Sequence, residues 1–337
     1  MSNSPIPVLV LFGPTASGKT RILLELFKSS DPLGSVPKIK AEIISADSMQ
    51  VYRGMDIGTA KPSAEERAYL PHHLIDIRNP CEQFNAGDFV RLAGEACKDI
   101  AGRGSLPVVS GGTGFYLKNL ILGLSEAPPS NKEIRAALNR ELQEKGVLSL
   151  MEELAACDPI SANRIHINDE YRLLRALEVY RICGQPLSSF NAPVLSSESS
   201  SSDPSSSDPD FCFIVVGLSR PREELYSRIN ERCAQMFEQG LADEVRKLYE
   251  AGYTPNDPGM RAIGYREFFI QDEKGGWRFS QDINGVQALI AQNSRRYAKR
   301  QITFFKNIPG VQWVHDEKEI SSLFRMTGIT TNKKEKI

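Results

Sequence analysis

Short apolar runs alternate with helical patterns along the first third of the chain. The runs 8–12, 41–46 and 106–110 are rich in aliphatic residues, and a weaker run covers 72–76. A helical pattern follows the first run, and another, over 88–100, precedes the third. Continuous apolar runs of this length, separated by helices, are typical of parallel strands that helices cover on both faces. The pattern therefore predicts an α/β core with a parallel sheet.

The pattern changes between about 125 and 195, where no strand signal occurs. Strand character returns at 211–218, and amphipathic segments follow at 222–237, 242–251 and 284–305, with a further helix expected after 261–267. We therefore expect one α/β domain that contains a helical insertion. The helices predicted in the insertion cover about 131–145, 147–156, 159–165 and 169–183.

The predicted domain limits follow from these changes of pattern. Residues 1–124 form the first part of the core, and 125–208 form the insertion, which ends in a Ser-rich loop. Residues 209–325 complete the core with its C-terminal helices, and 326–337 form a disordered tail. The stretch 196–208 consists mostly of Ser, Asp, Glu and Pro, a composition that cannot bury a core.

A glycine-rich segment follows the first apolar run. Residues 13–20, Gly-Pro-Thr-Ala-Ser-Gly-Lys-Thr, fit the pattern G-x-x-x-x-G-K-[ST], with a predicted strand before and a helix after. Backbone N–H groups of such a loop surround a phosphate, and the positive end of the helix supports them. Lys19 adds a mobile charge, and the Thr20 hydroxyl can hold Mg²⁺. The segment predicts a bound polyphosphate without saying whether it is cleaved or transferred.

One acidic residue stands at a predicted strand end beside this loop. Asp47 follows the run 41–46, and chemistry in such sheets collects at the carboxyl ends of strands. A turn or N-cap role remains open for Asp47. The strand at 106–110 ends in Gly-Gly-Thr-Gly (111–114), where an ATPase usually has a magnesium-binding acid. These glycines permit either close backbone approach to a ligand or a tight turn.

The composition gives no global attraction to nucleic acid. The net charge of the 337 residues is -1, so an RNA site would have to be a local patch. Six scattered cysteines without a C-x-x-C pair suit a reducing compartment and argue against a zinc site or a disulfide framework. No apolar stretch approaches ~20 residues. We expect a cytoplasmic protein without a membrane span, and no obligate protein partner is evident.

Two helices carry candidate cationic contacts. Between Asp282 and Asp316 the chain has five cations and no acid, which favours a phosphodiester or pyrophosphate contact. An ordinary basic surface is the alternative. Arg172 and Arg175 flank an apolar stripe in the segment 169–183, where a solvated helix face is the plainer interpretation.

Taken together, eight segments in the same order make the chain resemble the bacterial-type tRNA dimethylallyltransferases, the isopentenyl transferases that prenylate an adenine next to the anticodon. The resemblance covers about 8–310, nearly the whole chain. The eight segments are 13–20, 44–53, 55–62, 72–76, 111–114, 168–179, 262–266 and 298–303.

The resemblance implies a P-loop NTPase-like fold and a reaction in which no nucleoside triphosphate is used. Asp47 matches the general base that accepts a proton from N6 of the adenine, and Arg232 is the best match for an arginine that meets the leaving diphosphate. Thr20 matches the ligand of Mg²⁺. The resemblance implies that the diphosphate of dimethylallyl diphosphate is held by Gly13, Pro14, Thr15, Ala16, Ser17, Gly18, Lys19 and Thr20.

The resemblance also implies that the insertion grips the tRNA anticodon stem-loop, and that the adenine 3′ to the anticodon is modified in tRNAs that read codons beginning with U. The implied tRNA contacts are Asp47, Ser48, Met49, Gln50, Thr113, Arg172, Arg175, Lys299, Arg300 and Gln301. Three other interpretations stay open: an enzyme that prenylates free adenine nucleotides, a nucleotide kinase or ATPase, and a non-catalytic RNA-binding module.

Overall fold

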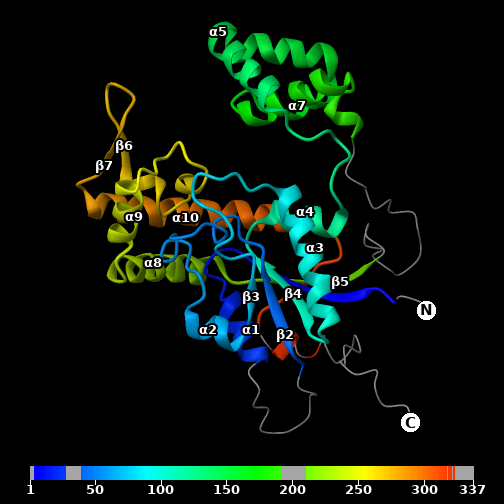
Figure 1. Ribbon diagram of the computed structural model, residues 1–337, viewed down its shortest axis with the longest axis vertical. Helices are drawn as coiled ribbons and strands as arrows, with labels where there is room; N and C mark the ends of the chain where they lie inside the picture. Colours follow the sequence, from blue (N-terminus) through cyan, green and yellow to red (C-terminus); the bar gives the residue numbers. More distant parts are fainter. Residues whose placement is uncertain (1–3, 28–38, 191–209, 317, 321, 323–337) are drawn as a thin grey trace. The chain divides into compact units, whose positions relative to one another are not determined.

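The computed structural model describes residues 4–27, 39–190, 210–316, 318–320 and 322. The described residues form a main sheet of six parallel strands in the order β3-β2-β4-β1-β5-β8 (Figure 1). This sheet confirms the predicted α/β core. Its strands are β1 (Ile6–Phe12), β2 (Ala41–Ser45), β3 (His72–His73), β4 (Leu106–Gly111), β5 (Phe211–Leu218) and β8 (Gln312–Val314).

Strand β1 is central, paired with β4 on one side and β5 on the other. Its residues from Val8 to Phe12 are all fully buried, so both faces of the sheet are covered. Leu9 and Leu11 belong to a core cluster with Ile22 and Leu23 of helix α1 (Lys19–Phe27). Helix α3 (Ala86–Gly102) also packs on β1, β2 and β4. The central strands therefore hold the phosphate loop and Asp47 on a rigid base.

The strand predicted at 72–76 is shorter than expected, with only His72–His73 paired. Strand β8 was not predicted, because its three residues give too short an apolar pattern to stand out.

The helices predicted over 88–100, 222–237, 242–251 and 284–305 are confirmed. Helices α8 and α10 lie side by side (Figure 1). The described helices outside the predicted insertion are α1, α3, α2 (Ala64–Tyr69), α4 (Gly114–Leu122), α8 (Arg222–Glu238), α9 (Leu241–Glu250) and α10 (Ile283–Phe305). Within the described part of the chain, no helix combines the length and the apolar character that a membrane crossing requires.

The helix expected after 261–267 is wrong. The chain there forms two short 3₁₀ turns, Gly259–Arg261 and Arg266–Phe268, and then the hairpin of β6 (Phe269–Gln271) and β7 (Trp277–Phe279). Aromatic packing accounts for the difference, since the Phe279 ring contacts both Phe268 and Phe269.

The chain divides into two compact units, Leu122–Asp203 and the remainder. The smaller unit holds α5 (Lys132–Cys157), α6 (Pro159–Arg164) and α7 (Glu170–Cys183), with a leucine-rich core of its own. Gly146, at φ 79°, interrupts α5 and divides it into the two predicted segments. The four predicted helices are thus confirmed. The Ser-rich segment 196–208 and the tail 326–337 lie outside the described residues, and the predicted domain limits stay predictions.

Candidate functional site

The phosphate loop lies between β1 and α1, where its backbone takes two left-handed positions, Ala16 at φ 62° and Gly18 at φ 92°. The Lys19 ammonium folds back over the loop and donates to the carbonyls of Gly13 and Pro14, each at 3.0 Å. Burial, together with the nearby Arg232, lowers the pKa of Lys19 to about 8, although Asp47 acts to raise it. Desolvation thus disfavours the charged form of Lys19, and a bound anion would favour it.

Two arginines, Arg220 just before α8 and Arg228 within α8, hydrogen-bond the backbone of the phosphate loop. Arg220 Nε donates to the Ser17 carbonyl at 2.8 Å, and Arg228 Nε donates to the Ala16 carbonyl at 3.0 Å. The Glu224 carboxylate lies 3.3 Å from both guanidinium groups. Arg228 lies four residues before Arg232 in α8, a spacing that places the two arginines on one helix face. Arg220 and Glu224 were missed, and only their spacing of four residues could have suggested a pair.

Asp47 follows β2, and its two carboxylate oxygens lie in different environments. Its Oδ1 accepts backbone N–H groups of Met49 at 2.9 Å and Gln50 at 3.4 Å, the turn-capping geometry that the sequence left open. Both bonds fall on Oδ1, so Oδ2 has no hydrogen-bond partner among the described residues. One carboxylate oxygen therefore shapes the loop, and the other is available for chemistry.

Two cavities meet at Asp47. The phosphate chamber has a volume of about 490 Å³ and is lined by the phosphate loop and α8. The apolar chamber has a volume of about 320 Å³ and is lined by side chains that include Ile229, Met236 and Ile290. The two cavities share Thr15, Asp47, Thr59, Arg232 and Tyr297.

The phosphate chamber has an excess of positive charge. Four cations line it against two carboxylates, Asp47 and Glu231. Burial lowers the pKa of Arg232 while Asp47 acts to raise it, so this guanidinium is poorly solvated. A polyanion entering the chamber would replace the missing solvation. The four cations are Lys19, Arg21, Arg228 and Arg232.

The exposed Thr20 hydroxyl lies at the start of α1 and lines the same chamber. Among the described residues, no three His, Cys, Asp or Glu side chains gather as a metal-binding group. A single hydroxyl ligand suits Mg²⁺ that takes its other oxygens from water and a bound phosphate. The residues present therefore fit a magnesium ion held together with a diphosphate.

The turn after β4 connects these groups. Gln301 of α10 accepts the Thr15 N–H at 2.9 Å and donates to the Gly112 carbonyl at 2.7 Å. The hydroxyl of Thr113, the residue after Gly112, accepts the Ser48 N–H at 2.9 Å. A Cβ on Gly111 would lie 2.1 Å from the Ala46 carbonyl oxygen, so close backbone approach requires this glycine. Gln301 and Thr113 therefore form hydrogen bonds with the protein backbone at this turn.

Gln50 has both ends of its amide engaged within the protein. It accepts the Ser45 hydroxyl at 2.8 Å and donates to the carbonyls of Thr59 and Ala60, each at 3.3 Å. Its side chain forms a wall of the phosphate chamber.

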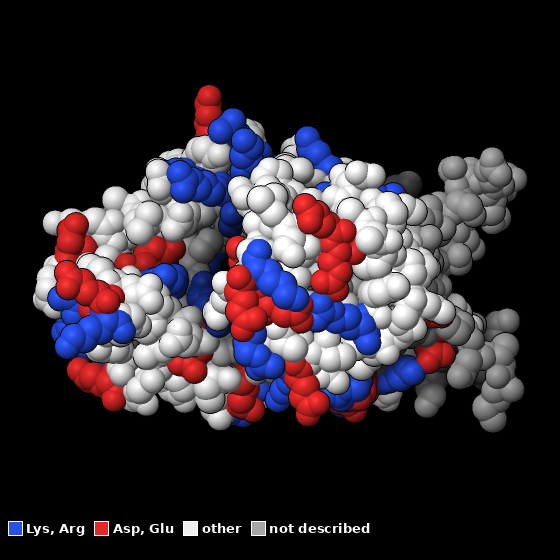
Figure 2. Space-filling view, turned by 90° about the horizontal axis from the view of Figure 1, so that it is seen from above, with Lys and Arg blue, Asp and Glu red and all other residues white. Residues whose placement is uncertain are grey.

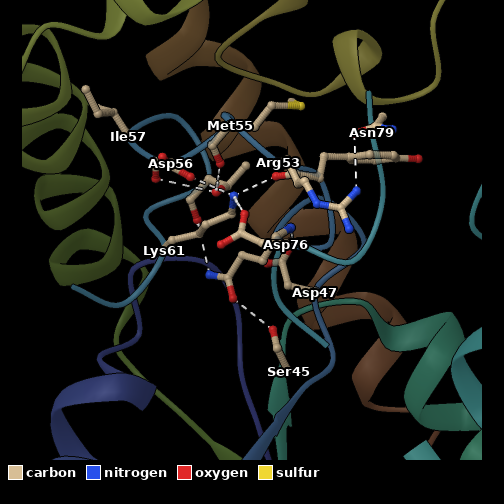
Figure 3. A network of polar contacts seen from close by, with 12 residues as sticks. Ser45, Asp47, Arg53, Met55, Asp56, Ile57, Lys61, Asp76 and Asn79 are labelled. Carbon is tan, nitrogen blue, oxygen red and sulfur yellow. Dashed lines mark hydrogen bonds and ion pairs between the residues drawn. The ribbon is translucent and has the colours of Figure 1, made fainter. Parts of the chain in front are cut away.

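The loop that Gln50 contacts is held by a buried lysine (Figure 3). Lys61 donates to the Tyr52 carbonyl at 2.6 Å and forms ion pairs with Asp56 at 2.7 Å and Asp76 at 2.5 Å. The Glu244 carboxylate accepts the N–H groups of residues 56, 57 and 58. The segment 55–62, which carries part of the resemblance, is therefore a scaffold for the loop beside Asp47.

The candidate RNA contacts fall into two groups. Ser48, Met49 and Arg300 line the apolar chamber, and Lys299 is exposed on α10. Basic and acidic side chains are interspersed on the face seen in Figure 2.

The smaller unit treats its two candidate arginines differently. Arg172 is highly exposed, with only a 3.3 Å ion pair to Asp169. Arg175 forms a 3.0 Å ion pair with the fully buried Glu178, which also binds Arg135 at 2.9 Å. The Arg172 side chain is accessible to a binding partner, whereas Arg175 takes part in the ion cluster that joins α5 and α7.

The parallel sheet, the phosphate loop and the cation-lined chamber define a P-loop-type α/β protein, and the chamber has the charge that a polyanion would require. Comparison with known proteins narrows the class. The sequence profile of the IPP transferase family matches residues 50–308. The chain belongs to the IPP transferase family, whose members are prenyltransferases.

Individual proteins with similar sequences or structures support the same family. "tRNA dimethylallyltransferase 1" of Syntrophotalea carbinolica is 41% identical over 95% of this chain and 94% of its own length. The crystal structure of a Bacillus halodurans tRNA isopentenylpyrophosphate transferase is 36% identical, with a TM-score of 0.62, over 96% of this chain and 95% of that one. A eukaryotic dimethylallyltransferase acting on tRNA, 24% identical with a TM-score of 0.70, covers 96% of this chain and 78% of that one and supports the fold alone.

Proposed function

We propose that this protein transfers the dimethylallyl group from dimethylallyl diphosphate to N6 of the adenine 3′ to the anticodon (position 37) in tRNAs that read codons beginning with U, releasing diphosphate. One observation carries the proposal: Asp47 and Arg232 line both the phosphate chamber and the apolar chamber. The names of the relatives, which match over nearly their whole length, support the same substrates.

The phosphate chamber would bind the diphosphate. Other backbone N–H groups of the loop and the N-terminus of α1 would donate to its oxygens, and Lys19 and Arg232, which line the chamber, would supply charge. Mg²⁺ would be held by the Thr20 hydroxyl and by the diphosphate itself, and it would supply charge neutralisation on the leaving group. Because the cations already surround the chamber, little reorganisation is needed as negative charge develops on the diphosphate.

The reaction joins N6 of the adenine to C1 of the dimethylallyl group. The C1–O bond breaks and its electron pair leaves with the diphosphate, while one N6 proton passes to Asp47. An exocyclic adenine amine is a weak nucleophile, so a carboxylate within hydrogen-bond reach is required. Asp47 Oδ2, which has no hydrogen-bond partner among the described residues, is the oxygen that would accept the proton.

The adenine would have to leave its base stack to reach this depth. We propose that Ser48, Met49, Thr113 and Arg300 surround the extruded base, and that Lys299 and Arg172 contact the RNA backbone. The predicted contacts Gln50, Arg175 and Gln301 already have hydrogen-bond partners within the protein and would act mainly by shaping the site. Cytoplasmic location remains a prediction.

The experiment is a transfer assay with labelled dimethylallyl diphosphate, in which unmodified tRNA and AMP are offered side by side. We expect label in tRNA, with one diphosphate released for each group transferred, and none in AMP. Label in AMP would instead favour a free-nucleotide enzyme. Release of phosphate from ATP without prenyl transfer would indicate an ATPase and contradict the proposal.

A further inference from the structure

Gln301 is a buried polar side chain on a helix whose neighbouring residues are exposed. Its side chain is only 5% exposed, whereas Lys299 and Arg300 of the same turn face solvent. Both ends of the amide are used: Oε1 accepts the Thr15 N–H, and Nε2 donates to the Gly112 carbonyl. The side chain therefore points into the core of the site, away from the exposed face of α10.

The two partners of Gln301 belong to different halves of the site. Thr15 lies in the phosphate loop after β1, and Gly112 lies in the turn after the neighbouring strand β4. A Cβ on Gly112 would lie 2.5 Å from Gln301 Nε2, so this position must be glycine to receive the amide. The adjoining Thr113 binds the backbone of Ser48, next to Asp47. The Gln301 amide thus connects the phosphate loop to the turn after β4, and Thr113 connects that turn to the loop that holds Asp47.

We propose that Gln301 is a positioning residue that sets the spacing between the phosphate loop and the turn 111–114, and through them the alignment of the diphosphate with Asp47. This inference rests on the proposed function. The amide offers one acceptor and one donor at this position, whereas an ionised carboxylate lacks the donor and a hydrocarbon lacks both. Displacement of reacting groups by about 1 Å can cost roughly 10²-fold in rate.

The first test is Gln301→Met, which keeps the length of the side chain and removes both hydrogen bonds. We expect kcat for prenyl transfer to fall by about 10²-fold, with a smaller rise in KM for dimethylallyl diphosphate. Gln292→Met, at an exposed position of the same helix, is the matched control and should behave as wild type. Thermal unfolding of both variants shows how much of each sample is folded at the assay temperature.

The result that overturns the proposal is a Gln301→Met enzyme whose kcat stays within about twofold of wild type. A loss no larger than the unfolded fraction of the sample would overturn it as well. A fall in kcat in a fully folded variant supports it, because a purely structural role would lower stability without changing the rate of the folded enzyme.

The second test is the pH profile of Gln301→Glu. An ionised glutamate accepts the Thr15 N–H but cannot donate to Gly112, whereas a protonated one does both. The ratio of variant to wild-type kcat should therefore rise as pH falls from about 8 to about 6, because burial raises the pKa of such a carboxyl. The same ratio for Gln301→Met should not change with pH. A Gln301→Glu ratio that is equally flat would contradict the proposal.

Calorimetry with inorganic diphosphate separates this proposal from the proposed function, since it needs no prenyl acceptor. We expect Gln301→Met to bind diphosphate about tenfold more weakly than wild type. If wild type fails to prenylate tRNA while this difference is present, the function is wrong and the bridge by Gln301 stands. If wild type prenylates tRNA and Gln301→Met matches it in both assays, the bridge is wrong and the function stands.

Discussion

Asp47 combines loop capping with the proposed proton transfer, and a single substitution can separate the two. Asp47→Asn keeps an oxygen for the N–H groups of Met49 and Gln50 but removes the basic carboxylate. We expect single-turnover transfer to tRNA to fall by about 10²-fold or more in both Asp47→Asn and Asp47→Ala. RNA affinity, measured by filter binding, should stay near that of wild type.

The exposed acid Asp243 provides the control, as Asp243→Ala removes a carboxylate on α9 outside the site. Near-normal turnover in Asp47→Asn, with a loss only in Asp47→Ala, would show that Asp47 is a turn residue and that another group takes the proton.

Lys19 makes diphosphate binding sensitive to alkaline pH. Its pKa of about 8 means that the free protein loses this charge as pH rises through about 8. The bound diphosphate prefers the charged amine, so affinity is full below this pH and weakens above it. Calorimetry from about pH 7 to about pH 9.5 should show the decline, with Lys19→Met as the reference that removes the effect of the ligand's own titration. Parallel pH dependences in the two proteins would contradict this assignment.

The residues that the sequence revealed are those whose role is local. The phosphate loop and Asp47 could be predicted because a motif and a strand end define them within a few positions. Arg220 and Gln301 could not be placed, since they contact the loop from 203 and 286 residues away. A spacing pattern shows that a glutamine lies among cations, but only the packing of α10 on the 111–114 turn shows that its amide faces inward.

At the scale of an element, α10 carries two cations that we propose as tRNA contacts. Lys299 and Arg300 are both exposed, and the Arg300 guanidinium also lies 5.8 Å from the centre of the Tyr297 ring and lines the apolar chamber. We expect Lys299→Ala to weaken tRNA binding and to reduce the salt slope by about one ion, with little change in kcat. Arg300→Ala should lower both affinity and kcat.

These two variants are compared with Lys274→Ala, which removes an exposed cation from the β6–β7 hairpin. The measurement is the tRNA affinity of each variant over a range of salt concentrations, which gives the salt slope. A salt slope that Lys299→Ala leaves at the wild-type value would exclude this residue from the RNA surface.

The helix pair α5–α7 depends on a buried ion cluster. Glu178 is fully buried and pairs with Arg135 and Arg175. Removing it in Glu178→Ala strands two partly buried cations, and we expect a loss of about 3–5 kcal/mol in the free energy of unfolding. Denaturant unfolding followed by circular dichroism measures this, with the exposed Glu144→Ala as control. Equal stability of the two variants would show that the cluster contributes little.

The same cluster predicts an acid limit to stability. Burial would raise the pKa of Glu178, but hydrogen bonds from Ser130, Arg175 and the Asn131 N–H outweigh it and hold the pKa below its usual value. The stabilisation is therefore full above the unfolded pKa of about 4.3 and is lost as pH falls through the lower folded value. The stability difference between wild type and Glu178→Ala should shrink on acidification in that range.

For the whole molecule, the sequence predicted the parallel core, the helical insertion and their order, because apolar periodicity over many residues reports each of them. It did not predict the hairpin β6–β7 or the edge strand β8. These elements have three residues per strand and depend on partners distant in the chain, Tyr249 for the hairpin and β5 for the edge strand. Short elements of this kind are decided by tertiary contacts, which a single sequence does not display.

The separate core of the smaller unit allows the two units to be tested apart. Leu138, Leu154 and Leu177 pack within that unit, whereas the chambers are lined by residues of the larger one. Replacing 125–208 by a flexible Gly/Ser linker should therefore leave diphosphate binding within about threefold of wild type while tRNA binding falls by at least about tenfold. Calorimetry and filter binding measure the two quantities, and Glu144→Ala in the intact chain controls for a harmless surface change. Unchanged tRNA affinity would show that the larger unit holds the RNA alone, and a lost diphosphate site would show that the units fold together.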